Sequence, residues 1–490
     1  MKMKAILTLS LAVLGLNAVA QPIPDRPEKL KYPKLTFEPP MADDFRHQLK
    51  AGPVAYLVPD RELPLINISV SVRAGTWLEP EGKEGLADMT GYLLSRGGTK
   101  SWSAKDLDEH MAFLAAQLGS SIGDTSGSVS LNLLTKDLDE GLKILREVLT
   151  SPRFETAKLK LRKDQLLQNM KQRNDNPRSI ERRERYRLVY GDDFFLNRLS
   201  TKASIESITQ DDLKRFHRRW FAPKNFIVAA NGDFDVKQMR AKLEKLFAKW
   251  PFKGSTPSPI PTNYTMAKPG IYIVEKDIPQ GRVNVVLPGI HRDDPEYFQS
   301  QIMNDILGGG GFTSRIMNRV RSDEGLAYSA GSALPGGIYY PQYFIAGFQS
   351  KSPTVAYATS IVMEELEKIT DSRVTDEEID TAKKSYIETF PQSFATKGQV
   401  AGLFATEEMT GRYKSNPNYY RDYREKIEAV NASDVRTIAK RLMKLDRAII
   451  LLVGKKEDIL KGHPDHKAKV TDLSKGQITD VPLRDPLTLE

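Results

Sequence analysis

Asp88 and Tyr92 lie four residues apart in the segment 85–94, and therefore share one face of a predicted helix. A zinc-peptidase helix of the form H-x-x-E-H holds its metal with two histidines at this spacing, and the glutamate between them activates water. Here Asp88 and Tyr92 stand at the ligand positions and Gly91 at the position of the base. One carboxylate without an imidazole offers too few ligands for zinc. The pattern favours a helix kept for packing over one in which Asp88 still helps to hold a metal.

The histidines and cysteines do not supply another metal site. The chain has no cysteine, which excludes thiolate ligands and disulfides. His463 and His466 flank Pro464, and a proline there prevents a regular helical pair of ligands. The other four histidines are isolated in the sequence and are interpreted as surface or structural residues: His47, His110, His217 and His291.

A run of four glycines is a second candidate site, and it consists of Gly308, Gly309, Gly310 and Gly311. A phosphate-binding loop would continue with Gly-Lys-Ser or Gly-Lys-Thr, whereas Phe312 follows here. The run therefore favours a turn between helices that requires positive φ angles.

The first twenty residues have the pattern of a cleavable secretory signal. Lys2 and Lys4 precede an apolar run, and Ala18-Val19-Ala20 forms a small-residue cleavage site. The apolar run is too short for a membrane span. Because no cysteine follows the cleavage site, a lipoprotein anchor is excluded. We expect a periplasmic protein, and its net charge of +9, about +7 after cleavage, could attract acidic partners but is too evenly mixed with acidic residues to indicate nucleic-acid binding.

The elements that would position these residues are duplicated along the chain. Asp212 and Asp434 each open a predicted helix, and Gly232 and Gly454 each end the strand that follows. The separation between the two aspartates equals the separation between the two glycines. Similar offsets relate a helix after residue 153 to one after residue 373, and the strand at 66–68 to the strand at 283–285. A nearly constant offset through several elements indicates two copies of one unit.

We therefore predict an α+β protein with two tandem homologous domains, each a mostly antiparallel sheet with helices packed on one face. Residues 251–261 contain four prolines and small polar residues, which is typical of an extended linker. The predicted layout is a signal peptide at 1–20, an extended arm at 21–44, a first domain at 45–250, a linker at 251–264, a second domain at 265–460 and a polar tail at 461–490.

The segment around 85–94 and a second segment at 308–329 resemble the pitrilysin, insulysin and mitochondrial processing peptidase family. Gly85-Leu86-Ala87 matches the residues that precede the first histidine of the family motif. The second segment, GGGGFTSRIMNRVRSDEGLAYS, is similar to the family's C-terminal signature. The resemblance covers nearly the whole mature chain and implies half of a peptidase clamshell, since a complete enzyme of this family needs four such units.

The resemblance also assigns residues. The family's third zinc ligand, a glutamate, corresponds to Asn169, so that Asp88, Gly91, Tyr92 and Asn169 are all degenerate positions. The arginine and tyrosine of the C-terminal signature, which in relatives reach the zinc-bound peptide across the clamshell, correspond to Arg321 and Tyr328. A guanidinium and a phenol can donate to a substrate carbonyl and to the oxyanion that forms on it.

Two interpretations of these assignments stay open. Arg321 and Tyr328 could instead make ordinary structural contacts. Gly308–Gly311 could handle substrate, since the zinc-free subunit of mitochondrial processing peptidase has a glycine-rich loop with that role, although the loop here is shorter.

The resemblance predicts the non-catalytic subunit of a periplasmic, two-chain zinc metallopeptidase that acts on peptides. This chain would bind no cofactor, and it would contribute Arg321 and Tyr328 to a homologous secreted partner that carries an intact H-x-x-E-H and the zinc. The alternative is a non-enzymatic peptide-binding or assembly protein of the same fold, as the core subunits of the respiratory bc1 complex resemble the same family.

Overall fold

A computed structural model describes residues 26, 29–30, 36–474 and 478–490. The predicted signal peptide lies outside these residues. The chain divides at Glu38 into two units, and the unit Pro39–Glu490 contains both sheets. In the first unit, the described residues include a turn in which the Lys29 N–H donates to the Arg26 carbonyl (3.1 Å). Among the described residues, no helix combines the length and the apolar composition that crossing a bilayer requires.

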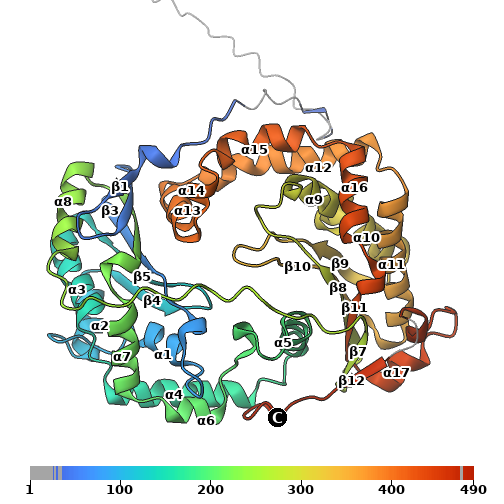
Figure 1. Cartoon of the computed structure of the whole chain (residues 1–490), viewed down its shortest axis with the longest axis horizontal. Helices are drawn as coiled ribbons and strands as arrows, with labels where there is room; N and C mark the ends of the chain where they lie inside the picture. The colour runs from blue at the N-terminus through green and yellow to red at the C-terminus, as the bar shows by residue number, and fades with distance from the viewer. Residues whose placement is uncertain (1–25, 27–28, 31–35, 475–477) are drawn as a thin grey trace, which may run out of the picture. The chain divides into compact units, whose positions relative to one another are not determined.

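The first repeat forms a six-stranded sheet and the helices that accompany it (Figure 1). Its strands are β1 (Arg46–Gln48), β2 (Val54–Pro59), β3 (Leu65–Val72), β4 (Gln117–Ile122), β5 (Gly127–Leu134) and β6 (Phe226–Gly232). Its helices are α1 (Leu86–Leu94), α2 (Ala104–Phe113), α3 (Leu138–Thr150), α4 (Thr156–Lys171), α5 (Pro177–Tyr190), α6 (Lys202–Ser207), α7 (Gln210–Trp220) and α8 (Val236–Phe247).

The second repeat forms another six-stranded sheet. Its strands are β7 (Gly270–Glu275), β8 (Gln280–Pro288), β9 (Ala327–Ala333), β10 (Tyr343–Lys351), β11 (Ile449–Gly454) and β12 (Ile478–Val481). Its helices are α9 (Tyr297–Asn304), α10 (Arg315–Met317), α11 (Val355–Asp371), α12 (Asp376–Thr389), α13 (Lys397–Thr410), α14 (Arg412–Ser415), α15 (Tyr419–Glu428), α16 (Ala432–Leu442) and α17 (Lys456–Lys461).

The two sheets repeat one topology. The strand orders are β1-β2-β6-β3-β5-β4 and β12-β7-β11-β8-β10-β9, and five of the six positions correspond in chain order. Most neighbours are antiparallel, and the exceptions are β2 with β6, β7 with β11, and β7 with β12. The predicted α+β fold with two mostly antiparallel sheets is confirmed. The residues between the sheets, 251–269, contain neither helix nor strand, and the predicted domain boundaries stay predictions.

The repeated helix starts also have a physical basis. The side chain of Thr209 accepts a hydrogen bond from the Asp212 N–H, and the side chain of Asn431 accepts one from the Asp434 N–H. The two aspartates bond back to the first residue, which completes a capping box at each helix. The same local chemistry thus begins α7 and α16, one in each repeat.

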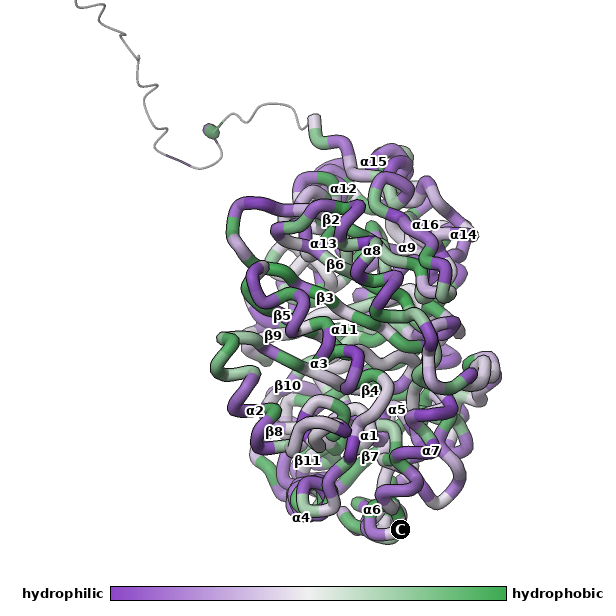
Figure 2. Tube along the Cα trace, turned by 90° about the vertical axis from the view of Figure 1, so that its left-hand side faces the viewer, coloured by the Kyte–Doolittle hydropathy of each residue, from purple (hydrophilic) through white to green (hydrophobic). Residues whose placement is uncertain are grey.

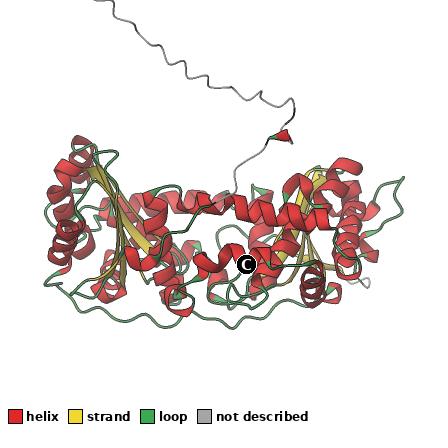
Figure 3. Cartoon of the chain, turned by 90° about the horizontal axis from the view of Figure 1, so that it is seen from above, coloured by secondary structure: helices red, strands yellow, loops and turns green. Residues whose placement is uncertain are grey.

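The strand sequences show that both faces of the sheets are covered. Every residue of β11 is buried, and its sequence is a continuous apolar run, which is typical of a strand packed on both sides. Figure 3 shows helices on both sides of each sheet, and Figure 2 shows hydrophobic and hydrophilic stretches alternating along the chain. The sequence predicted helices on one face only, so the covering of the second face needs a separate explanation.

A reciprocal exchange of helices covers that second face. Helix α5 belongs to the first repeat but packs on β11 and β8 of the second sheet, whereas α13 belongs to the second repeat and packs on β6 and β2 of the first (Figure 1). The two helices are equivalent in the duplication, because their first residues are separated by the same offset as residues 153 and 373. Polar contacts accompany the exchange: Arg185 donates to Asn284 (2.7 Å), and Arg46 pairs with Glu408 (2.9 Å).

The C-terminal residues correct the prediction of a polar tail. Ile478–Val481 form β12, which pairs in parallel with β7 at the edge of the second sheet. Beyond it, Arg484 pairs with Glu184 of α5 (3.2 Å), and the carbonyl of Leu487 accepts a hydrogen bond from the backbone N–H of Lys202 (2.8 Å). We call residues 478–490 the C-terminal strap. Its backbone hydrogen bonds and Arg484 anchor it, and Ile478, Val481 and Leu487 pack against the apolar cores. These few apolar residues are scattered in a mostly polar sequence, so a hydropathy pattern does not reveal the contacts.

Candidate functional site

In the degenerate zinc motif, an arginine lies between the two side chains that stand at the ligand positions. Arg162 of α4 donates to the Asp88 carboxylate (2.8 Å). The centre of its guanidinium lies 4.0 Å from the centroid of the Tyr92 ring, and that of Arg96 lies 4.6 Å from the same ring. The guanidinium thus supplies a fixed positive charge to Asp88, and a metal cation beside it would be repelled.

Gly91, at the position of the catalytic base, lies too close to strand β4 for any side chain. A Cβ atom added there would lie 2.3 Å from the backbone nitrogen of Ile122. In addition, the Ser120 hydroxyl donates to the Gly91 carbonyl (2.6 Å), which joins α1 to β4. The position of the catalytic base is therefore occupied by a glycine that lets α1 pack directly against the backbone of β4.

Asn169 lies on α4, and its side chain is exposed. No hydrogen bond or ion pair joins it to Asp88 or Tyr92 within the described part of the chain. Arg162 precedes it by two helical turns, so both project from one side of α4. The seven-residue spacing from Asn169 could have identified Arg162 in the sequence. Arg162 was nevertheless missed, because α4 contains several other basic residues.

The donors around α1 do not fit zinc. One carboxylate, one phenol and one exposed amide are present, and the carboxylate already pairs with an arginine. Nowhere in residues 36–474 or 478–490 do three or more side chains of His, Asp or Glu cluster in a way that could hold a metal ion. Asp88, Tyr92 and Asn169 therefore do not form a zinc site.

The histidines with described contacts pack against other residues of the chain, as expected of structural residues. His217 is buried, and its Nε2 lies 3.0 Å from the Leu149 carbonyl. Burial lowers the pKa of His217 to about 3. His466 stacks on Tyr357 with 3.9 Å between ring centroids and lies 4.9 Å from the His463 ring.

The glycine run lies in a turn between α9 and α10, as the sequence predicted. Asp305–Gly309 form a π-helical turn, and of the four glycines only Gly311 has a positive φ (+62°). Gly308 is required for another reason, because a Cβ atom there would lie 2.5 Å from the backbone nitrogen of Ser332 on β9. The predicted requirement for positive φ therefore holds at Gly311, whereas close approach to β9 explains the glycine at position 308.

Arg321 and Tyr328 come together beside this loop. The Arg321 guanidinium lies 4.5 Å from the ring of Phe312 and 4.8 Å from the ring of Tyr328, measured to the centroids. Phe312 is 64% exposed and Tyr328 is 85% exposed. Within the described part of the chain, the guanidinium makes no hydrogen bond or ion pair, so its donors remain free.

Tyr328 stands at the start of β9, the edge strand of the second sheet. It lines a cavity of about 480 Å³ whose other wall includes Arg178 and Glu181 of α5. Gly325, with φ of +62°, ends the π-helical turn Asn318–Asp323 that carries Arg321 and leads the chain into β9. A free guanidinium and an exposed phenol held next to each other can donate to one carbonyl oxygen supplied from outside the chain.

The described part of the chain has the fold of a metallopeptidase without a metal site of its own. It combines duplicated sheets, a peptidase-like helix that lacks the metal ligands, and an Arg–Tyr pair whose donors are free among the described residues. Comparison with known families agrees. Residues 59–199 match the model described as Insulinase (Peptidase family M16), and residues 207–386 match Peptidase M16 inactive domain. The chain belongs to this M16 family.

Relatives and solved structures carry similar descriptions. A protein of Helicobacter pylori named Non-peptidase homolog YmxG is 26% identical over 67% of this chain and 76% of its own length. An Uncharacterized zinc protease of Rickettsia bellii is 24% identical over 78% of this chain and 91% of its own. The crystal structure of a peptidase M16 inactive domain from Pseudomonas fluorescens has a TM-score of 0.75 at 23% identity, and covers 86% of this chain and 99% of that one.

A larger protein shares the same fold. The periplasmic protease PqqL of Escherichia coli has a TM-score of 0.72 at 15% identity, and it covers 90% of this chain but only 50% of its own. Structures this distant in sequence show the fold alone.

Proposed function

We propose that this chain is the non-catalytic subunit of a heterodimeric zinc metallopeptidase that acts on peptides. The observation that carries the proposal is the contrast between two sites in one chain. Arg162 pairs with the residue at the former ligand position. In contrast, the half-buried Arg321 lies next to the exposed Tyr328, and neither side chain has a hydrogen-bond partner among the described residues.

In the proposed complex, a homologous partner with an intact H-x-x-E-H holds the zinc, which activates the attacking water. Arg321 and Tyr328 of this chain donate to the peptide carbonyl that the water attacks. Negative charge develops on this oxygen, so these donors stabilise the transition state more than the bound peptide. The rings of Phe312 and Tyr328 both lie within cation–π distance of the guanidinium, which favours its position beside them before substrate arrives.

The proposed complex forms in the periplasm. The basis is the pattern of residues 1–20, which resembles a cleavable secretory signal. Fractionation of cells that express the full chain tests this part: the processed protein should be released with the periplasmic fraction and begin at Gln21.

A second candidate is a non-enzymatic peptide-binding or assembly protein of the same fold. The name of the Helicobacter pylori relative, a non-peptidase homologue, favours it, as does the complete loss of ligands at Asp88, Tyr92 and Asn169. This candidate predicts binding of peptides without any partner-dependent hydrolysis.

Co-expression distinguishes the two candidates. The chain should be produced alone and together with a secreted homologue that carries H-x-x-E-H, then separated by size exclusion and assayed on a quenched peptide mixture. The subunit proposal predicts a stable complex, burying more than about 1,000 Å² in total, and hydrolysis only by the complex. Separate elution of the two chains at micromolar concentration would leave the binding-protein candidate.

A further inference from the structure

A cavity of about 700 Å³ opens beside Asn169, between the end of α4 and one side of α5. Three arginines contribute to its wall: Arg173, Arg182 and Arg183. Of its lining residues, all of which are described, only Asp124 is acidic. Burial raises the pKa of Asp124, and the three arginines outnumber this one carboxylate in the wall.

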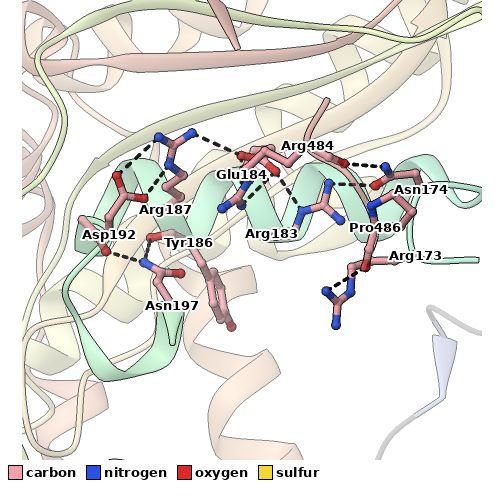
Figure 4. Close-up of polar contacts among 11 residues, drawn as sticks. Arg173, Asn174, Arg183, Glu184, Tyr186, Arg187, Asp192, Asn197, Arg484 and Pro486 are labelled. Atoms are coloured by element: carbon pink, nitrogen blue, oxygen red, sulfur yellow. Dashed lines mark hydrogen bonds and ion pairs between the residues drawn. The ribbon is translucent and has the colours of Figure 1, made fainter. Parts of the chain in front are cut away.

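The arginines behind this wall outnumber the carboxylates that neutralise them (Figure 4). Glu184 is fully buried and is shared by three arginines, Arg183 (2.8 Å), Arg484 (3.2 Å) and Arg187 (3.9 Å). Burial lowers the pKa of Arg173, and the charges of Arg183 and Arg484 lower it further. One buried carboxylate thus serves a cluster of cations, and the cavity wall is electropositive.

Two of the cavity arginines have guanidinium donors that no described residue accepts. Arg183 is more than nine-tenths buried, and its Nη1 has no hydrogen-bond partner, although its Nη2 donates to Asn174 (2.9 Å). Arg182 is exposed and, within the described residues, forms neither a hydrogen bond nor an ion pair. A buried unsatisfied guanidinium donor is costly, and an anionic acceptor would remove that cost.

The remaining walls indicate what kind of anion fits. Leu166, Met170, Leu196 and Leu199 line the cavity together with the ring of Tyr186. A bare inorganic ion would leave this apolar surface wet, whereas a peptide can place apolar side chains there and a carboxylate at the arginines. We propose that this cavity binds an acidic peptide segment, with one or more Asp or Glu carboxylates held by Arg182 and Arg183.

This inference names a substrate class, acidic peptides, for the proposed function, and as a statement about substrates it rests on that function. Asn169 stands at the family's third ligand position and also lines the cavity, so a peptide held here would pass the remnant of the metal site. The binding itself needs no partner subunit. A measurement on the isolated chain therefore separates failure of this inference from failure of the subunit proposal.

The test is fluorescence anisotropy of the full mature chain with a rhodamine-labelled, C-terminally amidated peptide that has adjacent glutamates between leucines. A twin peptide carries glutamines in their place. We expect the glutamate peptide to bind about tenfold more tightly than its twin, and to weaken as salt is raised. Arg182→Glu should abolish that preference, and Arg183→Lys, which keeps a charge for Glu184 but loses the free Nη1, should reduce it.

Arg61→Glu is the matched control, because Arg61 is exposed and lines neither this cavity nor the one beside Tyr328. It should leave the preference unchanged. Equal affinity for both peptides, or equal losses with Arg182→Glu and Arg61→Glu, would overturn the inference. So would displacement of the peptide by inorganic phosphate at constant ionic strength together with no preference for glutamate, since the site would then hold a free anion only.

Discussion

At the scale of single residues, the positions on α1 of the missing metal ligands and of the base make structural contacts of their own. Arg162 supplies a positive charge that pairs with Asp88, and Gly91 lets α1 approach β4. Both changes stabilise the structure without a metal, so the former site is now part of the packing. The sequence predicted which positions had lost their function, because their spacing follows the helix period. It could not reveal that Arg162 replaces the metal's charge, since that depends on how α4 packs on α1.

This packing predicts the effect of filling Gly91. Gly91→Ala should destabilise the protein by about 1–3 kcal/mol, because its Cβ would meet the β4 backbone and the helix or the strand must shift. Gly402→Ala is the control: it also lies inside a helix, and a Cβ there meets nothing within 4 Å. Its effect should be neutral or stabilising, by up to about 1 kcal/mol. Urea denaturation of both variants measures the difference, and equal midpoints would contradict this account of Gly91.

The same residues predict how a metal site could return. The chain as purified should contain no stoichiometric zinc and cleave no peptide by itself. Restoring only the ligands, with Asp88→His, Tyr92→His and Asn169→Glu, should give weak zinc binding because Arg162 stays beside them. Adding Arg162→Gln should tighten binding by at least about tenfold, since removing one nearby like charge is worth more than about 1.4 kcal/mol at short range. Calorimetric titration with zinc measures both variants, and a tightly bound zinc in the unmodified chain would refute the prediction.

His217 predicts a pH dependence of stability. Burial is the main cause that lowers its pKa from 6.5 to about 3. Between these values the unfolded chain binds a proton that the folded chain does not, so stability falls as pH decreases below about 6.5. The loss from this residue is at most about 1.4 kcal/mol per pH unit. His217→Gln keeps a donor for the Leu149 carbonyl and should remove this part of the slope, whereas His291→Gln should not. Urea midpoints between pH 7 and pH 4.5 provide the measurement, and identical slopes would exclude this role.

At the scale of elements, sequence patterns predicted helices and strands better than their packing partners. The offset found in the sequence relates the helices after residues 153 and 373, which are α4 and α12, and the structure shows that the same offset relates α5 to α13. That each covers the sheet of the other repeat could not be predicted, because the apolar face of a helix does not identify its partner. The C-terminal strap was missed for a related reason. β12 pairs with β7 and buries Val481 in the core, but its two central residues, Thr479 and Asp480, are polar and exposed, so its sequence resembles a tail.

The strap predicts a specific loss of stability. Arg484→Gln leaves the buried Glu184 with fewer charged donors, and should lower the free energy of unfolding by about 1–3 kcal/mol. Lys467→Gln removes a positive charge from the exposed part of the C-terminal segment and should change stability by less than about 0.5 kcal/mol. Thermal unfolding of both variants tests this, and equal melting temperatures would show that the strap does not contribute to stability.

At the scale of the whole molecule, the repeats have diverged in opposite directions. The first retains its fold around a helix without metal ligands. The second holds a half-buried arginine next to an exposed tyrosine, and the described residues use the donors of neither. This asymmetry is expected of a chain that completes another chain's site. The sequence resemblance predicted Arg321 and Tyr328 individually. That they lie side by side, with the Phe312 ring also next to the guanidinium, depends on the turn at Gly325 and on the edge position of β9.

The most direct test of the central claim is steady-state kinetics of the complex assembled with the zinc-bearing partner. Tyr328→Phe keeps the ring over Arg321 but removes the phenol donor, and it should lower kcat/KM by roughly 10²- to 10³-fold, as should Arg321→Ala, with zinc content and complex formation unchanged. Tyr272→Phe on β7, which is separated from β9 by three strands, and Arg218→Ala on α7 are the matched controls and should behave as the unmodified complex. Unchanged kcat/KM in a complex that carries both Tyr328→Phe and Arg321→Ala would contradict the account, because this chain would then contribute architecture but no donors to the active site.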